Sequence, residues 1–468
     1  MTIVVQGGVV VSTSGATQAD LVIEGESIAA LLTTGSETSK LAAVNAERVV
    51  DATGCYVLPG GVDAHVHLQL PMSPEATSSD TFSSGTKAAA WGGTTTVIDF
   101  AGQVAGMHVR DVVEARLAEA DGQCVIDYGF HLAMGDVTTS SLAEMGRLVD
   151  EGITSFKYFM AYPGAYYSDD GQLLEAMFRA ADLGAMVMMH AENGIAIDVL
   201  RDRAAANGSV QAVWHARTRP AILEGEAVHR ASALAAVANA PLYIVHLSST
   251  EALNQVAAAR HDDRNIFAET CPQYLRLTLE EHLDQPGIDG LRHICSPPLR
   301  SSTDHDNLWK GLRQNELAVV ATDHCPFCDN EKLLGVDDFR NAPNGLGSIE
   351  HRMDLLHQGV VAGEISLARW VETCSTTPAR LFGLYPRKGV LAPGSDADVV
   401  IYDPQKQHTI SAQTHHMQLD HSVWEGTVLD GQVRTVLSRG TFVIDNQTFV
   451  GRQGHGQYVR RTLSDLLL

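Results

Sequence analysis

The middle of the chain alternates unbroken apolar runs with stretches of helical periodicity. Strands buried on both faces have such continuous apolar runs, as in a parallel sheet covered by helices. We predict eight strands, at residues 57–65, 94–100, 125–132, 153–159, 185–190, 242–246, 265–269 and 318–323. Helical stretches lie between the strands, such as residues 109–120, 171–183 and 224–238.

Eight strand-then-helix units over roughly 270 residues predict an α/β fold of the (β/α)8 TIM-like barrel type. A doubly wound open sheet is the alternative for the same pattern. Short apolar strands with glycine turns fill both chain ends, and we expect these ends to form one small β-sandwich domain. The expected division is residues 1–57 plus 390–450 for this domain, 58–389 for the barrel and 451–468 for a C-terminal tail.

Composition and charge disfavour several classes of protein. The 468 residues carry 33 Lys and Arg against 56 Asp and Glu, a net charge of −23. Such a surface repels nucleic acid and acidic membranes. The chain has no apolar run long enough to span a bilayer and no secretory leader pattern at its N-terminus. Seven scattered cysteines form no disulfide framework, so we expect a reducing, cytoplasmic setting.

Polar residues gather where the predicted strands end. A (β/α)8 barrel carries its chemistry at the C-terminal ends of its strands, and five strands deliver such residues there. They are His65, His67, Lys157, His190, His246 and Asp323. The His-x-His spacing directs both rings to one face of a strand, because side chains alternate with a period of two. The six residues predict one metal centre at the barrel mouth.

Lys157 lies inside an apolar strand, where a buried ammonium is costly. In one interpretation its long side chain reaches solvent at the barrel mouth. In the other, CO2 converts the amine into an anionic carbamate that bridges two cations and lowers the net positive charge of the centre. Imidazole and carboxylate ligands favour Zn²⁺, and two such ions would activate a shared water molecule.

Longer motifs surround these residues and resemble the amidohydrolase superfamily, and within it the dihydropyrimidinase/hydantoinase family. The resemblance covers nearly the whole chain. The motifs are PGGVDAHVH at 59–67, GGTTTVIDF at 92–100, SFKYFMAY at 155–162, HAENG at 190–194, SPPLR at 296–300, TDHC at 322–325, PNG at 343–345 and GSDAD at 394–398. The loops after His67 and Tyr162 depart from the common family pattern and are expected to border the pocket for the ring substituent.

The resemblance implies metal-dependent hydrolysis of the cyclic amide bond in a dihydropyrimidine or a 5-substituted hydantoin, giving an N-carbamoyl amino acid. It implies that two divalent ions, with zinc expected, are held by His65, His67 and Asp323 on one side, His190 and His246 on the other, and carbamylated Lys157 between them. Asp323 would also transfer the proton during catalysis.

The resemblance also implies roles for residues around a small cyclic ureide substrate. Tyr162 would donate its hydroxyl to the developing oxyanion, although it could instead only pack a turn. Backbone groups of Ser296 and Asn344 would hold the edge of the ring. Phe159 and Tyr166 are our candidates for an apolar wall, with core packing as the alternative.

Three alternatives remain open at this level. An allantoinase or dihydroorotase would use the same fold and metals, although dihydroorotate would call for an arginine that the sequence does not reveal. A non-catalytic scaffold would have lost metal ligands, whereas all six positions are filled here. The family implies a homotetramer with the tail on a neighbouring subunit, and a dimer is the alternative.

Overall fold

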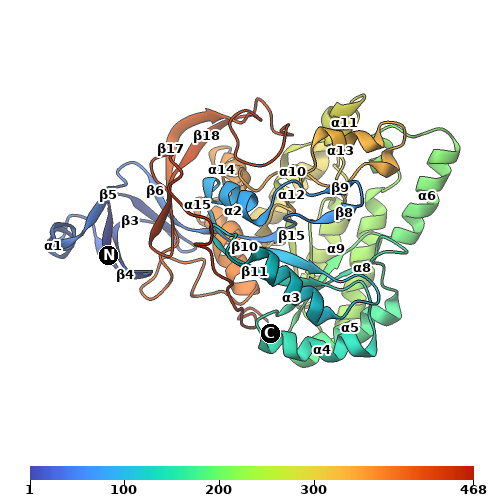
Figure 1. The fold of residues 1–468 in the computed structure, drawn as a ribbon, viewed down its shortest axis with the longest axis horizontal. Coiled ribbons are helices and arrows are strands. Elements are labelled where there is room, and N and C mark those ends of the chain that lie inside the picture. Colours follow the sequence, from blue (N-terminus) through green and yellow to red (C-terminus); the bar gives the residue numbers. More distant parts are fainter. Residues whose placement is uncertain (468) are drawn as a thin grey trace.

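The computed structural model describes residues 1–467 and contains a barrel of eight parallel strands paired in chain order (Figure 1). The strands are β7 (Gly61–Val66), β10 (Thr94–Gly102), β11 (Asp127–Ala133), β12 (Ser155–Phe159), β13 (Met186–His190), β14 (Leu242–Ile244), β15 (Ile266–Thr270) and β16 (Val319–Val320). A parallel bridge between Val66 and His324 joins the first strand to the segment after the last. The sheet therefore nearly closes. Its sequential order excludes the doubly wound open sheet, in which the strand order reverses.

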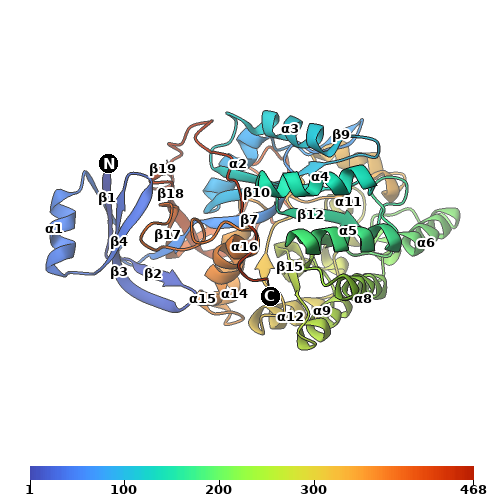
Figure 2. The same ribbon diagram turned by 90° about the horizontal axis from the view of Figure 1, so that it is seen from below.

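Helices alternate with the barrel strands and cover their outer side (Figure 2). The α-helices are α1 (Glu37–Asn45), α2 (Phe82–Trp91), α3 (Val109–Ala120), α4 (Thr139–Asp150), α5 (Asp170–Leu183), α6 (Gly194–Ala206), α7 (Trp214–Arg217), α8 (Ala221–Ala238), α9 (Thr250–His261), α10 (Pro272–Arg276), α11 (Ile288–Arg292), α12 (Ser302–Arg313), α13 (Asp329–Lys332), α14 (Arg352–Val361), α15 (Leu367–Val371) and α16 (Thr377–Leu381). Side-chain capping boxes start α2, α4 and α5 at Thr81, Thr138 and Asp169. Within residues 1–467, no helix has both the length and the apolar character needed to cross a bilayer.

Strands from both chain ends pair in one nine-stranded mixed sheet, which appears in Figure 1 as blue and red strands side by side. They are β1 (Thr2–Gln6), β2 (Val9–Ser12), β3 (Gly15–Glu24), β4 (Ser27–Thr33), β5 (Arg48–Asp51), β6 (Tyr56–Pro59), β17 (Val399–Thr409), β18 (Val428–Ser438) and β19 (Thr441–Ile444). Their apolar side chains, such as Ile3, Leu21 and Val399, form a core of their own. The two ends of the sequence thus build one sheet, as their pattern predicts.

The apolar run at residues 57–65 is two strands, not the single strand that its pattern predicts. β6 pairs with β17 and β2 in the terminal sheet, and β7 pairs with β10 in the barrel. Between them, a Cβ atom on Gly60 would lie 2.0 Å from Thr95 Oγ1, so only glycine fits there. The chain passes from the sheet to the barrel at this close approach.

The C-terminal tail packs on the barrel of its own chain. Tyr458 forms a parallel bridge with Tyr128, and the backbone N–H of Val459 donates to the Tyr128 carbonyl at 2.8 Å. Further along, Arg461 Nη1 donates to Ser155 Oγ at 2.9 Å. These contacts tie the tail to β11 and β12, and a role for it between subunits stays a prediction.

Candidate metal centre

His65, His67 and Asp323 bring their ligand atoms together at the barrel mouth. His65 Nε2 lies 3.2 Å from His67 Nε2 and 3.1 Å from Asp323 Oδ1, and His67 Nε2 lies 3.3 Å from the same oxygen. The three ligand atoms all lie within 4.8 Å of one another. Two imidazole nitrogens and a carboxylate oxygen at such separations are a donor set suited to a cation of the zinc class.

The Lys157 side chain points from β12 into the same centre. Its Nζ lies 2.9 Å from His65 Nε2, and the residue is 2% exposed. Burial lowers the pKa of this amine from its ordinary 10.5 to about 8, although the carboxylates of Asp323 and Glu269 act in the opposite direction. A larger share of the amine is therefore neutral at physiological pH than for an exposed lysine.

His190 and His246 form the other half of the centre. Their ring centroids are 4.6 Å apart, and the His246 ring lies 5.4 Å from that of His65. His190 Nε2 pairs with Glu192 Oε2 at 2.9 Å, which leaves Nδ1 as its other possible ligand atom. His246 Nδ1 is buried and has no hydrogen-bond partner among residues 1–467. The two rings thus offer nitrogen donors beside the first cluster.

Two of these residues lie just beyond their strands in an unusual conformation. His246 follows the end of β14 with a φ of +39°, and Asp323 follows the end of β16 with a φ of +52°. Non-glycine residues adopt this left-handed region only where the surroundings hold them there. For Asp323 the neighbouring residue is fixed by a hydrogen bond, because Thr322 Oγ1 donates to the buried Asp63 carboxylate at 2.7 Å.

A cavity of about 240 Å³ opens directly onto the centre. All of the predicted site residues except His65 line it, namely His67, Phe159, Lys157, Tyr162, Tyr166, His190, His246, Ser296, Asp323 and Asn344. The Tyr162 ring lies 5.0 Å from that of His190, and the Phe159 and Tyr166 rings are 5.0 Å apart. The aromatic side chains of Phe159, Tyr162 and Tyr166 therefore lie together in the lining of the cavity.

Ser296 and Asn344 line this cavity and have free backbone groups. Neither residue's N–H or C=O takes a hydrogen-bond partner within the described chain. Beneath them lies the buried Lys332, whose Nζ donates to the carbonyls of Ile294 at 3.0 Å and Gly345 at 2.8 Å. This lysine ties together the two segments that carry the free backbone groups.

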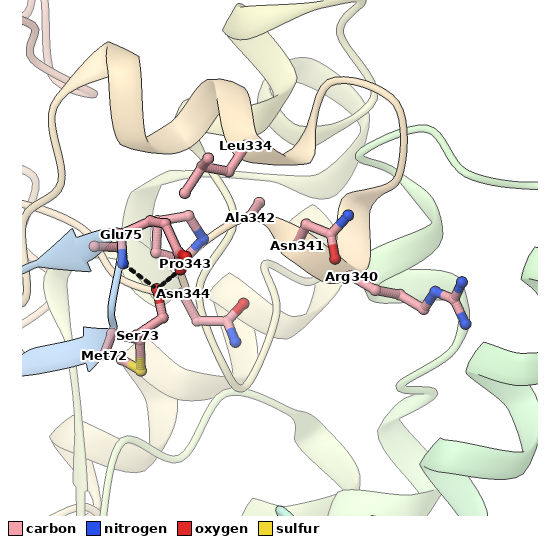
Figure 3. A pocket seen from close by; sticks show the side chains of 10 residues that line it. Met72, Ser73, Glu75, Leu334, Arg340, Asn341, Ala342, Pro343 and Asn344 are labelled. Carbon is pink, nitrogen blue, oxygen red and sulfur yellow. Dashed lines mark hydrogen bonds between the residues drawn. The ribbon is translucent and has the colours of Figure 1, made fainter.

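A second pocket of about 480 Å³ lies beside the cavity mouth (Figure 3). The hairpin of β8 (Pro71–Ser73) and β9 (Ala76–Thr77) forms one side and residues 334–344 the other. Met72 and Asn344 line both this pocket and the cavity. The loop after His67, where the sequence departs from the family pattern, therefore borders the entrance.

Glu269, which the sequence analysis placed at a strand end without a role, joins both halves of the centre. Its buried carboxylate contacts His65 Nδ1, accepts a hydrogen bond from the Tyr243 hydroxyl at 2.7 Å, and accepts one from the backbone N–H of His246 at 3.1 Å. The sequence feature that could have indicated this role is a carboxylate at the end of a predicted buried strand, residues 265–269. Glu192 and Lys332, described above, are two further contributors that the sequence analysis missed.

Comparison with known proteins finds relatives that match along nearly the whole chain. The model of the amidohydrolase family matches residues 56–443. The D-hydantoinase of Streptomyces coelicolor is 52% identical over 465 residues, covering 99% of each chain. The D-hydantoinase of Geobacillus stearothermophilus is 43% identical over 98% of this chain and 97% of its own.

Solved structures give the same result. The dihydropyrimidinase of Brevibacillus agri superposes with a TM-score of 0.95 at 44% identity, over 99% of each chain. The L-hydantoinase (dihydropyrimidinase) of Arthrobacter aurescens superposes with a TM-score of 0.88 at 29% identity, over 98% of this chain and 99% of its own. With the barrel, the terminal sheet and the donor set in place, the chain belongs to the amidohydrolase family and, within it, to the dihydropyrimidinase and hydantoinase group.

Proposed function

We propose that this protein is a metal-dependent hydrolase that opens the ring of a 5-substituted hydantoin, or of a dihydropyrimidine, to give an N-carbamoyl amino acid. The observation that carries the proposal is the cavity of about 240 Å³, which is lined by five of the six donor residues, by the Tyr162 phenol and by Ser296 and Asn344. Relatives named D-hydantoinase at 42–52% identity favour the D-form of a hydantoin.

Two divalent ions fit the donor set. His65, His67 and Asp323 would hold one, His190 and His246 the other, and Lys157 would bridge them as a carbamate. In that modification the neutral amine adds to the carbon of CO2 and loses a proton, and the lowered pKa of Lys157 favours the neutral form. When bound, the two ions activate water and polarise the carbonyl group of the substrate.

Asp323 is the proposed proton carrier. Burial tends to raise the pKa of its carboxyl, but His65 and His67 outweigh burial and hold this pKa well below its usual range. The ionised carboxylate accepts a proton from the attacking water as its oxygen bonds to the ring carbonyl carbon. It then delivers that proton to the ring nitrogen as the C–N bond breaks.

Tyr162 is the proposed hydrogen-bond donor to the carbonyl oxygen. Burial and the nearby Glu192 carboxylate raise the pKa of its phenol, so the hydroxyl stays protonated at neutral pH. A neutral phenol aimed at the oxygen that gains negative charge stabilises the transition state more than the substrate.

The chemistry of the cavity favours a ring without a carboxylate. Among the described residues that line it, none is an arginine, and the single lysine, Lys157, is the proposed carbamate. The unpaired N–H and C=O groups of Ser296 and Asn344 suit the alternating C=O and N–H edge of a hydantoin or dihydrouracil. Dihydroorotate, which carries a carboxylate, would lack an arginine partner here.

Three finer assignments belong to the same proposal. Zinc is the proposed metal, because imidazole and carboxylate ligands suit it. A reducing cytoplasm is the proposed setting, and all seven cysteines are free. A homotetramer is the proposed assembly. Ile195 and Val199, exposed by 52% and 55% on one face of α6, are candidates for a covered surface.

A substrate panel tests the proposed reaction. The purified zinc-loaded protein is assayed with dihydrouracil, the D- and L-forms of one 5-substituted hydantoin, allantoin and dihydroorotate. We expect the highest kcat/KM for the D-hydantoin or dihydrouracil, with dihydroorotate not turned over. Highest kcat/KM for allantoin or dihydroorotate would contradict the proposal.

A pair of variants tests the proposed metal bridge. Lys157→Ala should lose both ions and all measurable turnover, because the bridging ligand is removed. Asp323→Ala should also abolish turnover. Metal analysis beside the assay separates loss of ions from loss of chemistry. Full metal content and full activity in Lys157→Ala would show that the bridge assignment is wrong.

A further inference from the structure

A second group of histidines lines a groove between the barrel and the terminal sheet. The groove has a volume of about 360 Å³ and lies where α14 meets β17 and β18. Figure 1 shows α14 at this junction. We call it the α14–β17 groove and define it by His351, Asp354, His408 and His415. It shares no lining residue with the catalytic cavity.

Two histidine nitrogens of the α14–β17 groove are buried and unpaired. His351 Nε2 and His415 Nδ1 have no hydrogen-bond partner among residues 1–467. His351 is 6% exposed and Asp354 is 5% exposed, and the Asp354 carboxylate contacts the buried Tyr402 hydroxyl. Nearly all buried polar groups in proteins are paired, so two such nitrogens in one groove point to a ligand that pairs with them.

The placement of these side chains suits a cation. His351 and Asp354 are three residues apart at the start of α14, which puts them on the same helix face. From the opposite side, His408 Nε2 of β17 lies 3.5 Å from Asp354 Oδ2. That separation is typical of two ligands bound to one ion. Three imidazoles and a carboxylate are ligands that Zn²⁺, Co²⁺, Ni²⁺ and Cu²⁺ bind well.

We propose that the α14–β17 groove binds one divalent transition-metal ion through His351, Asp354, His408 and His415. Among the described residues, the groups of three or more His, Cys, Asp or Glu side chains with ligand atoms within 4.8 Å of one another lie elsewhere. Binding of an ion in the groove therefore requires the His351 or His415 ring to rotate toward Asp354. The ion would link a barrel helix to a strand of the terminal sheet. Its binding would therefore stabilise the junction between the two, independently of the catalytic centre.

Metal counting on the full chain tests this proposal. The wild-type protein, His351→Gln and Asp354→Asn are equilibrated with Zn²⁺, freed of unbound ion, and analysed for zinc per chain. We expect each variant to hold one ion fewer than the wild type. The difference does not depend on how many ions the catalytic centre holds. His261→Gln, at the exposed end of α9, is the matched control and should lose none.

Thermal unfolding gives a second measurement that does not require activity. Added Zn²⁺ should raise the Tm of the wild type and of His261→Gln by several degrees more than the Tm of the two groove variants, because binding to the folded state stabilises it. All four proteins should hydrolyse the substrate at similar rates. Equal zinc content in wild type and both groove variants, with equal shifts in Tm, would overturn the proposal.

Discussion

At the scale of single residues, Glu269 connects the two halves of the metal centre. Its carboxylate contacts His65 Nδ1 and the backbone N–H of His246. Such second partners orient metal-binding rings and raise their basicity. Replacing the carboxylate by a neutral amide in Glu269→Gln should therefore weaken metal binding by about 10- to 100-fold. Competition with a chelator of known affinity measures this change.

Tyr243→Phe is the matched control for that prediction. It removes only one hydroxyl donor to Glu269, 2.7 Å away, and leaves the negative charge of the carboxylate in place. Metal affinity should then fall much less than in Glu269→Gln. Equal losses in both variants would mean that packing at this position, and not the charge, governs the affinity.

A second prediction at the residue scale concerns Tyr162, whose ring lies 5.0 Å from that of His190. Tyr162→Phe should lower kcat by about 10²- to 10³-fold, the loss typical of one oxyanion donor, and change KM little. Steady-state kinetics with zinc content measured in parallel check it. A kcat near that of the wild type would assign Tyr162 to packing of the turn.

At the scale of elements, Lys332 holds two loops in place from the end of α13. Its Nζ donates to the carbonyls of Ile294, Pro343 and Gly345 at 3.0, 2.9 and 2.8 Å. These loops carry Ser296 and Asn344, which line the cavity and have free backbone groups. Lys332 touches neither the cavity nor the metal ligands, so it acts by positioning.

Lys332→Met should weaken substrate binding by the loops that carry Ser296 and Asn344, while the metal content stays unchanged. Loss of charged donors leaves buried carbonyls unpaired, at a cost of about 1–3 kcal/mol. We expect KM to rise about tenfold, which corresponds to about 1.4 kcal/mol. Kinetics and metal analysis together check this expectation. Loss of metal with unchanged KM would contradict it.

At the scale of the whole molecule, a buried ion network joins the barrel, the terminal sheet and the tail. Lys388 Nζ lies 2.6 Å from Asp127 at the start of β11 and 2.8 Å from Asp398 just before β17. Arg439, after β18, contacts Asp127 at 3.1 Å and also the carbonyl of His455 in the tail. Four segments far apart in the sequence therefore meet at one set of charges.

Lys388→Met should destabilise the fold, because it removes the cation that the buried carboxylates of Asp127 and Asp398 share. Breaking one partner of a buried ion pair costs about 3–5 kcal/mol. Arg387→Met is the control, since Arg387 is exposed and pairs with Asp396 at 2.9 Å. An exposed pair contributes about 0–1 kcal/mol. Urea unfolding should show a large shift for the first variant only, and similar midpoints would contradict the prediction.

Much of the fold could be predicted from local pattern. Unbroken apolar runs separated by helical periods indicate buried parallel strands, and α3 has the bounds that its periodicity predicts. The barrel and a sheet made from both ends follow from the same patterns, because side-chain burial repeats along an element. Ligand-type residues at strand ends, such as His65 and Asp323, also mark the barrel mouth as the place of the proposed metal centre.

The sequence by itself therefore determined most of the barrel elements, the barrel end at which the ligand-type residues gather, and the family of the chain. Only the tertiary structure decided how distant side chains meet. The change from sheet to barrel at Gly60, the link from Glu269 to His65, and the contacts of Lys332 with three carbonyls all depend on close approach between separate segments. Periodicity reports which face of an element is buried, but the partner on that face is set by packing in three dimensions.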